Sequence, residues 1–337
     1  MLKQLKSTSV IGIDISPLSI NALQISRTED NYRLDNFASE LLPPCTVVDN
    51  QIRDTEVLSE CIKKLLSKTN FSSKLTVLAV PDSAIITKTL QISSLLAEAD
   101  IEDAVIREAG KHFSYSLNDI NFDFVVQGIS DMHLDRFDVL VTACRAEHVR
   151  SRVEAVENAG LKTRVVEIES KAMERVLLLL IKQCLQEKPK ETIAIMNINK
   201  LVTNLYVAHK GKIIFTHEEP LGNHQGVEMF KPQYKSASNG QEESSLYMDL
   251  IVRQIKRMLQ FFSLANSLNS IDHLFLAGDA VFSPNLCQRI LEKIRIPVSV
   301  ANPFAGMLLS QHISLHKIIE KGPALLIALG LALRTCD

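Results

Sequence analysis

Two segments of the chain, half a molecule apart, share one pattern of apolar and polar positions. In each, an apolar run, a short polar turn and a second apolar run follow one another, at Val10–Ile25 (VIGIDISPLSINALQI) and Ile193–Val207 (IAIMNINKLVTNLYV). This pattern predicts a β-hairpin whose polar residues gather where the chain reverses. One copy near the start of each half predicts two related α/β domains that face each other across a cleft, with both turns pointing into it.

The rest of the first half predicts further strands and a helix of an α/β sheet. Tyr32–Leu42 has the composition of a strand, and Glu56–Leu66 carries its leucines and isoleucine on one helical stripe. Leu75–Val80 is a continuous apolar run of strand length. A run of this kind is typical of a strand buried on both faces, as in the parallel part of an α/β sheet.

In the next eighty residues the order of predicted elements changes, and it predicts a small α+β module inside the first half. Its elements follow in the order helix, two strands, helix, strand. The predicted ranges are a helix capped by Ser93 or Ser94 that runs to about Lys111, strands at Phe122–Gly128 and Phe137–Ala143, a helix at Ala146–Ala159 that ends on Gly160, and a strand at Thr163–Ile168.

An apolar helix at Ser170–Leu185 follows, and we place the boundary between the halves at the break Lys188-Pro189-Lys190. The second half has predicted strands and helices in alternation, as the first half does. A polar stretch at Lys231–Glu243 interrupts them and predicts a surface loop. The other predicted elements are a turn at Leu221-Gly222-Asn223, a helix at Ser245–Leu268, a strand at Leu274–Gly278, a helix to Ile294, a strand at Val298–Val300 and a closing apolar helix at Pro323–Arg334.

Two strand ends carry residues suited to a nucleotide. Gly12 lets the backbone approach a ligand closely, and Asp14 is the type of ligand that holds a magnesium ion through water. Gly278, at the end of a later strand, has room beside it for an adenine or a ribose. Glycine and aspartate also end strands for turn reasons alone, and Asp279 after Gly278 favours a plain turn. The second hairpin has Asn197 and Asn199 at its turn, which leaves its chemistry open.

Other classes of site are excluded or disfavoured. The chain contains neither G-x-S-x-G nor G-x-x-x-x-G-K-[ST], which excludes a nucleophile-elbow hydrolase and a P-loop ATPase. The nine histidines are dispersed, and His312 and His316 share a helical spacing without a nearby carboxylate, which indicates a solvated helix face. The six cysteines form no C-x-x-C pair, so we expect a reducing compartment rather than disulfides or zinc.

Length and composition agree with this picture. A chain of 337 residues with 46% apolar residues has enough material for two domains with large cores. Its net charge of −2, without any basic run, argues against nucleic acid as the main partner. No secretory signal is visible, and the longest apolar runs are far shorter than the roughly 20 residues that cross a bilayer. We therefore expect no direct membrane insertion.

Taken together, these motifs resemble the PilM family of type IV pilus assembly proteins, which are actin-like and related to FtsA. VIGIDISPLSINALQI is similar to the family's first phosphate hairpin, and LFLAGDA to its adenosine motif. The most specific likeness lies in FDVLVTACRAEHVRSRVEAVENAGLKTRVVEIESKAMER, which crosses from the inserted module back into the core. VSVANPFAGM and ALLIALGLALR resemble the two segments that close the family's second half and its last helix.

The resemblance implies an α/β fold of the FtsA/Hsp70 superfamily, namely an actin-like, duplicated two-domain core with an inserted α+β subdomain. The implied limits are 1–84, 166–188 and 323–337 for the first domain, 85–165 for the inserted subdomain, and 189–322 for the second domain with a helical part at about 226–269. It also implies a partner. Members of the family bind the N-terminal cytoplasmic tail of PilN between the inserted subdomain and the first domain, and are linked indirectly to PilO and PilP. The expected location is cytoplasmic, on the inner face of the bacterial inner membrane.

The resemblance further implies a cleft for ATP and Mg²⁺, with Asp14 facing the metal. The implied nucleotide-binding residues are Gly12, Asp14, Ser16, Asn197, Asn199, Thr203, Gly222, Gly278 and Asp279. Several positions depart from the family's pattern: glycine is common where Ser16, Asn223 and Asp279 stand, lysine where Asn21 stands, and Asp-x-Gly where Asn197 and Asn199 stand. These changes remove a carboxylate and add bulk, so we expect ATP binding to be weak or absent and hydrolysis not to occur.

Three functional hypotheses follow from the sequence. The first is an adaptor that binds the PilN tail and has a degenerate ATP site. The second is a slow actin-like ATPase that holds Mg-ATP with Asp14 and the two hairpins. The third is the analogous cytoplasmic component of a type II secretion system, which shares the fold and the adaptor role. Self-association, which actin-like folds permit, stays open, and no residue of the peptide groove is assigned.

Overall fold

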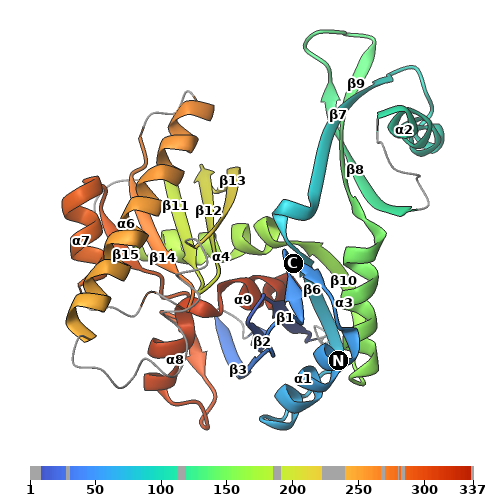
Figure 1. Cartoon of the computed structure of the whole chain (residues 1–337). Helices are drawn as coiled ribbons and strands as arrows, with labels where there is room; N and C mark the ends of the chain where they lie inside the picture. The colour runs from blue at the N-terminus through green and yellow to red at the C-terminus, as the bar shows by residue number, and fades with distance from the viewer. Residues whose placement is uncertain are drawn as a thin grey trace.

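The computed structural model describes residues 9–27, 31–112, 119–184, 191–221, 240–266, 270–279, 281 and 285–334. Two β-sheets stand on either side of a pair of central helices, and a third, smaller sheet projects from the first domain (Figure 1). The mixed sheets and helices form the duplicated α/β core that the repeated hairpin predicts.

The first sheet has six strands in the order β10-β6-β1-β2-β3-β16. The predicted hairpin is confirmed, with Asp14 opposite Asn21, and β6 lies between β1 and β10 and runs parallel to both. This placement explains the unbroken apolar sequence of β6, because both of its faces are covered. The bounds are β1 Ile11–Ile15, β2 Ser19–Arg27, β3 Tyr32–Leu41, β6 Leu75–Val80, β10 Lys162–Ile168 and β16 Leu308–Leu309.

The second sheet repeats this arrangement in the order β13-β12-β11-β14-β15. Its hairpin pairs Asn197 with Asn204, and β14 runs parallel to β11 as β6 does to β1. Asn197 therefore occupies the position that Asp14 has in the first hairpin. The bounds are β11 Thr192–Ile198, β12 Val202–His209, β13 Lys212–Pro220, β14 His273–Ala277 and β15 Val298–Val300.

Helices α4 (Glu169–Cys184) and α9 (Leu326–Leu333) lie between the two sheets and belong to one core with both of them. They approach so closely that side chains are excluded at two points. A Cβ on Gly330 would lie 2.9 Å from Ala172 Cα, and a Cβ on Gly12 of β1 would lie 2.6 Å from Ala332 N. Glycine at both positions lets the backbone of α9 contact α4 on one side and β1 on the other.

The outer faces of the two sheets are covered by separate pairs of helices. Helices α1 (Thr55–Ser67) and α3 (Ala146–Asn158) cover the first sheet, and α6 (Gly240–Ala265) and α7 (Leu286–Ile294) cover the second. The predicted loop 231–243 lies outside the described residues up to 239, and its last four residues belong to α6. None of the helices in the described ranges is long and apolar enough to cross a bilayer.

The inserted module is a three-stranded antiparallel sheet, β7-β9-β8, with α2 (Glu98–His112) packed on one face. Its strands are β7 Ile85–Ser93, β8 Ile120–Ile129 and β9 Arg136–Arg145. The sequence pattern did not predict β7, and Ser93 closes this strand instead of capping a helix. The reason is that only the end of β7 has buried apolar residues: Leu90 and Ile92 pack in the core shared with α2, whereas residues 86–89 are exposed.

The assignment of the last helix and strand to the module also differs from the structure. β10 pairs with β6 in the first sheet, and the buried Ala155 and Val156 of α3 share a core with α1. The chain therefore returns to the first domain at the end of β9, and α3 covers the outer face of the first sheet. Gly160 does end α3 as predicted, with a positive φ of 86°.

Candidate functional site

The turns of the two hairpins face a common cavity of about 390 Å³ between the domains. The two turns are built alike, since Ser16 N donates to Ser19 O at 2.9 Å and Asn199 N donates to Val202 O at 3.0 Å. The cavity brings together five of the residues that the sequence singles out, namely Asp14, Ser16, Asn197, Asn199 and Asp279. We call this cavity the interdomain cleft.

Three other predicted binding residues, all within the described ranges, do not line the interdomain cleft. Gly12 lies in the middle of β1 beneath α9, so packing accounts for it. Gly278 has a φ of 98°, and a Cβ there would lie 2.7 Å from Ile198 N, so it lets the end of β14 meet the second hairpin. Thr203 is buried, and its hydroxyl oxygen has no partner among the described atoms. Gly222 lies outside the described residues.

Much of the polar lining of the interdomain cleft already bonds to protein. Asn21 donates to Ala324 O at 3.4 Å and accepts from the Ser39 hydroxyl at 2.7 Å. Ser16 donates through its hydroxyl to Ser19 O at 2.9 Å, and the Asn199 side-chain oxygen accepts from Asp279 N at 3.4 Å. Lys200 and Lys321 add cationic side chains to the lining, beside the carboxylates of Asp279 and Glu320.

Sequence reasoning predicted Asp14 but missed three further acidic residues, Asp82, Glu169 and Glu218, at the inner end of the interdomain cleft. A carboxylate follows, or ends, each of the three parallel strands of the first sheet: Asp14 in β1, Asp82 after β6 and Glu169 after β10. Glu218 of β13 faces them from the second domain, and Asp14, Glu169 and Glu218 line one small inner hollow. The signal was available, because the carboxyl ends of parallel strands meet at one edge of a sheet.

Burial raises the pKa of the three carboxyl groups that the first domain supplies, Asp14, Asp82 and Glu169. It raises the pKa of Asp14 from 3.8 to about 6, against the opposing effects of Asn21 and Arg152. Burial likewise raises the pKa of Asp82 to about 6. The pKa of Glu169 lies well above its ordinary value because of burial and of the neighbouring Asp14 and Asp82 charges. Asp14 and Asp82 therefore take up protons near pH 6.

Arg152 of α3 is the buried cation beside this cluster, and its side chain is only 2% exposed. It donates to two backbone carbonyls, His148 O at 3.0 Å and Asn50 O at 3.2 Å. Its charge opposes the raised pKa values of Asp14 and Glu169. In the sequence Arg152 stands between Ser151 and Val153, which gave no sign that this arginine would be buried.

The residues present do not match a magnesium site built by the protein. In the described part of the chain, no three histidine, cysteine, aspartate or glutamate side chains lie close enough to hold a metal ion. The second hairpin supplies an amide, Asn197, where the first supplies Asp14, and divalent hard cations favour ionised carboxylates. The interdomain cleft has the volume of a small-molecule site, and its lining combines six amide or hydroxyl side chains with five charged and four apolar ones.

Replacing Asp14 with asparagine should stabilise the fold above pH 6. The unfolded chain releases this proton near pH 3.8 and the folded chain near pH 6, so ionisation lowers the free energy of unfolding as pH rises between these values. The variant avoids this loss, which is roughly 3 kcal/mol at most. Urea unfolding at pH 4 and pH 8 measures the free energy of unfolding of both proteins. The variant should be the more stable of the two only at pH 8. A variant that is less stable at pH 8 would contradict the prediction.

A second hollow, of about 740 Å³, lies between the inserted module and the core. We call it the module groove. Its module side carries apolar residues of β8 and β9, among them Phe122, Phe124, Val125 and Leu140. Its core side is formed by the ends of β6, β10 and α9 and the start of α4. Further lining residues are Val80, Ile85, Val166, Ile168, Lys171, Lys212 and Arg334.

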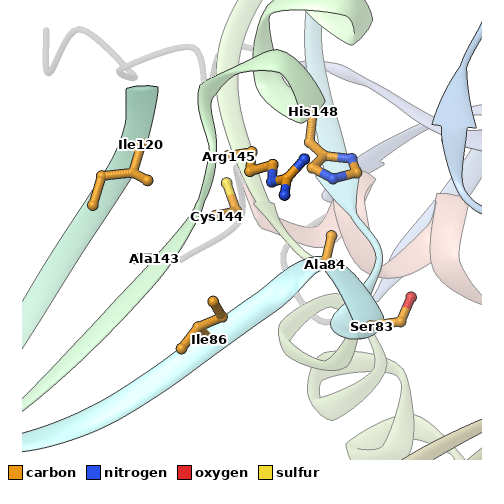
Figure 2. A pocket seen from close by; sticks show the side chains of 8 residues that line it. All are labelled: Ser83, Ala84, Ile86, Ile120, Ala143, Cys144, Arg145 and His148. Atoms are coloured by element: carbon orange, nitrogen blue, oxygen red, sulfur yellow. The ribbon is translucent and has the colours of Figure 1, made fainter. Parts of the chain in front are cut away.

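A smaller hollow of about 190 Å³ lies at the stem of the module (Figure 2). Figure 2 shows Ser83, Ala84 and Ile86 where β7 begins, Cys144 and Arg145 where β9 ends, and His148 on α3. Cys144 and Ala143 line both this hollow and the module groove. Burial raises the pKa of the Cys144 thiol, which disfavours the reactive thiolate. The stem of the module, where β7 begins and β9 ends, therefore borders both hollows.

Known structures share this architecture. A PilM-PilN type IV pilus biogenesis complex matches with a TM-score of 0.76 and 20% identity, over 98% of this chain and 99% of that chain. The ethanolamine utilization protein EutJ from Carboxydothermus hydrogenoformans matches with a TM-score of 0.53 and 13% identity, over 96% and 89%. At these identities the likeness concerns the fold. The family described as type IV pilus assembly protein PilM matches residues 12–336. The chain therefore belongs to the PilM family of type IV pilus assembly proteins.

Proposed function

We propose that this chain is an adaptor of type IV pilus assembly that binds the N-terminal tail of PilN in the module groove. The observation that carries the proposal is the groove itself, which has a volume of about 740 Å³, is mainly apolar and lies between the inserted module and the first domain. Membership of the PilM family and the fold of the PilM-PilN complex support the choice of partner. Through PilN, the chain would stay at the inner face of the inner membrane, next to PilO and PilP.

The chemistry of the module groove suits an extended, mainly apolar peptide. β8 is an edge strand of the module sheet, and its residues from Asn121 to Val125 line the groove one after another. An edge strand offers backbone hydrogen bonds to an incoming segment, and alternate side chains of that segment then enter pockets on either side. Val125 is 63% exposed, and together with Phe122 and Phe124 it forms an apolar part of the groove lining that a bound segment would cover.

The ATP site is proposed to be degenerate. The amides of Asn197 and Asn199, the internal hydrogen bonds of Asn21 and Ser16, and the raised pKa of Asp14 all disfavour Mg-ATP. The alternative of a slow ATPase draws support from the volume of the interdomain cleft alone. The alternative of a type II secretion component is less favoured, because the family that matches the chain is a pilus family.

Isothermal titration calorimetry of the full chain with a synthetic PilN tail from the same genome tests the proposal. Binding that is equal with and without Mg-ATP is the expected result, since the module groove and the interdomain cleft are lined by different residues. Binding that requires Mg-ATP would contradict the degenerate site. If the tail peptide releases or takes up no binding heat, with Mg-ATP or without it, the adaptor function itself would be overturned.

Thermal unfolding gives a second, separate expectation for the nucleotide. A ligand stabilises the folded state by RT ln(1 + [L]/Kd), so millimolar Mg-ATP with an equally weak Kd adds below about 0.4 kcal/mol. We expect a shift of the melting temperature of at most about 1 °C for a chain of this size. A shift of several degrees that Asp14→Ala abolishes would support the ATPase hypothesis instead.

A further inference from the structure

We propose that Asn50 and Glu218 form a clasp that keeps the interdomain cleft closed without any ligand in it. Asn50 belongs to the first domain, and Glu218 lies in β13 of the second. The Asn50 amide nitrogen lies 2.8 Å from Glu218 Oε1 and 3.0 Å from Oε2, so one of its N–H groups is shared between the two carboxylate oxygens. This inference is independent of the proposed function, since neither residue lines the module groove.

The local backbone fixes where Asn50 points. Strands β4 (Val47–Val48) and β5 (Gln51–Ile52) form a small hairpin whose two-residue loop is Asp49-Asn50. Both loop residues have positive φ, 49° and 60°, as the tightest hairpin turn requires. Asparagine tolerates this conformation well, so the tip is formed without a glycine and carries an amide side chain.

Hydrogen bonds within each domain hold the clasp in place. On the first domain, the buried Arg152 donates to Asn50 O, and Ser83 accepts a further hydrogen bond from the Asn50 amide at 3.0 Å. On the second domain, Asn204 of β12 donates to Glu218 Oε2 at 2.9 Å. Hydrogen bonds to a carboxylate are stronger than those between neutral groups, and this one receives them from both domains.

The clasp closes the inner end of the interdomain cleft. The inner hollow, which Asn50 and Glu218 line together with Asp14, Glu169 and Asn197, has a volume of about 20 Å³. That space holds about one water molecule. In an open cleft, a bound ligand has to draw the two domains together, whereas here the protein's own side chains already bridge them.

Small-angle X-ray scattering of the ligand-free full chain tests the clasp. Asn50→Gly removes the amide while keeping a residue that accepts positive φ, and Glu218→Ala removes the acceptor. Each variant should have a larger radius of gyration than the wild type. The matched control is Glu219→Ala on the same strand, because Glu219 bonds to Arg257 within the second domain, at 3.0 Å from Arg257 Nε. This control should scatter like the wild type.

A rescue variant separates the clasp from a general loss of structure. Asn50→Asp places a carboxylate against Glu218 and should open the cleft further than Asn50→Gly. Adding Glu218→Gln to Asn50→Asp exchanges donor and acceptor, and should return the radius of gyration toward that of the wild type. Unchanged scattering in Asn50→Gly and Glu218→Ala, with both variants folded, would overturn the proposal. So would a double variant that stays as open as Asn50→Asp alone.

Discussion

Replacing Gly330 with alanine is expected to destabilise the fold by roughly 3 kcal/mol or more. In an ordinary helix this change stabilises by up to about 1 kcal/mol, because alanine has the higher helix propensity. Here the added Cβ would lie 2.5 Å from Ala172 C and 2.9 Å from Ala172 Cα. A backbone atom cannot rotate away as a side chain does, so α4 and α9 would have to separate and disturb the core that both domains share.

The free energy of unfolding, measured in urea, checks this prediction. Gly110→Ala is the matched control, since Gly110 is an exposed residue inside α2. The control should be unchanged or slightly more stable, and the sign of the effect should therefore differ between the two glycines. Wild-type stability in Gly330→Ala would mean that the two helices pack less closely than described.

The second large effect is expected at the module groove, where Val125→Asp should weaken PilN-tail binding by more than about tenfold. Val125 lines the groove and is largely exposed, so the change places a charge against the bound peptide without disturbing the core of the module. A peptide that covers the new carboxylate has to remove its water without providing a partner. Calorimetry with the same tail peptide measures the loss.

Val126→Asp is the control for this variant, because it places the same charge on the next residue of the same edge strand. Val126 is 39% exposed and does not line the module groove, so binding should stay close to that of the wild type. Equal loss in both variants would place the peptide elsewhere on the module. If the wild type itself fails to bind, the adaptor proposal fails, whatever the variants do.

Periodicity predicted the elements that local pattern determines. The two hairpins, the doubly buried β6 and the end of α3 at Gly160 are confirmed because apolar alternation, an unbroken apolar run and a positive-φ glycine are local properties. β7 was not predicted because little of this strand is buried, so the sequence of Ile85–Ser93 is mostly polar. The sequence placed β10 in the inserted module instead of the first sheet. Strand order depends on pairing with a distant segment, here β6, and the local pattern does not show that pairing.

The candidate site was predicted only in part, for a related reason. Asp14, Asn197 and Asn199 sit in recognisable turns, and the structure brings them to one cavity. Asp82 and Glu169 belong to the same edge of the sheet, but this emerges only once the strands are known to be parallel. The module groove had no local signal at all, since its lining comes from strands and helices far apart in the sequence.

The module enters and leaves the first domain at one place, and this has a consequence for how the protein can be altered. Ile85 at the start of β7 lies opposite Cys144 at the end of β9, so the two connections to the core are neighbours (Figure 1). The whole segment between them is a cassette: a short linker from Ala84 to Arg145 would close the chain without lengthening any core element. Evolution or an engineer can exchange such a cassette, and with it the binding specificity, while the duplicated core keeps its sequence.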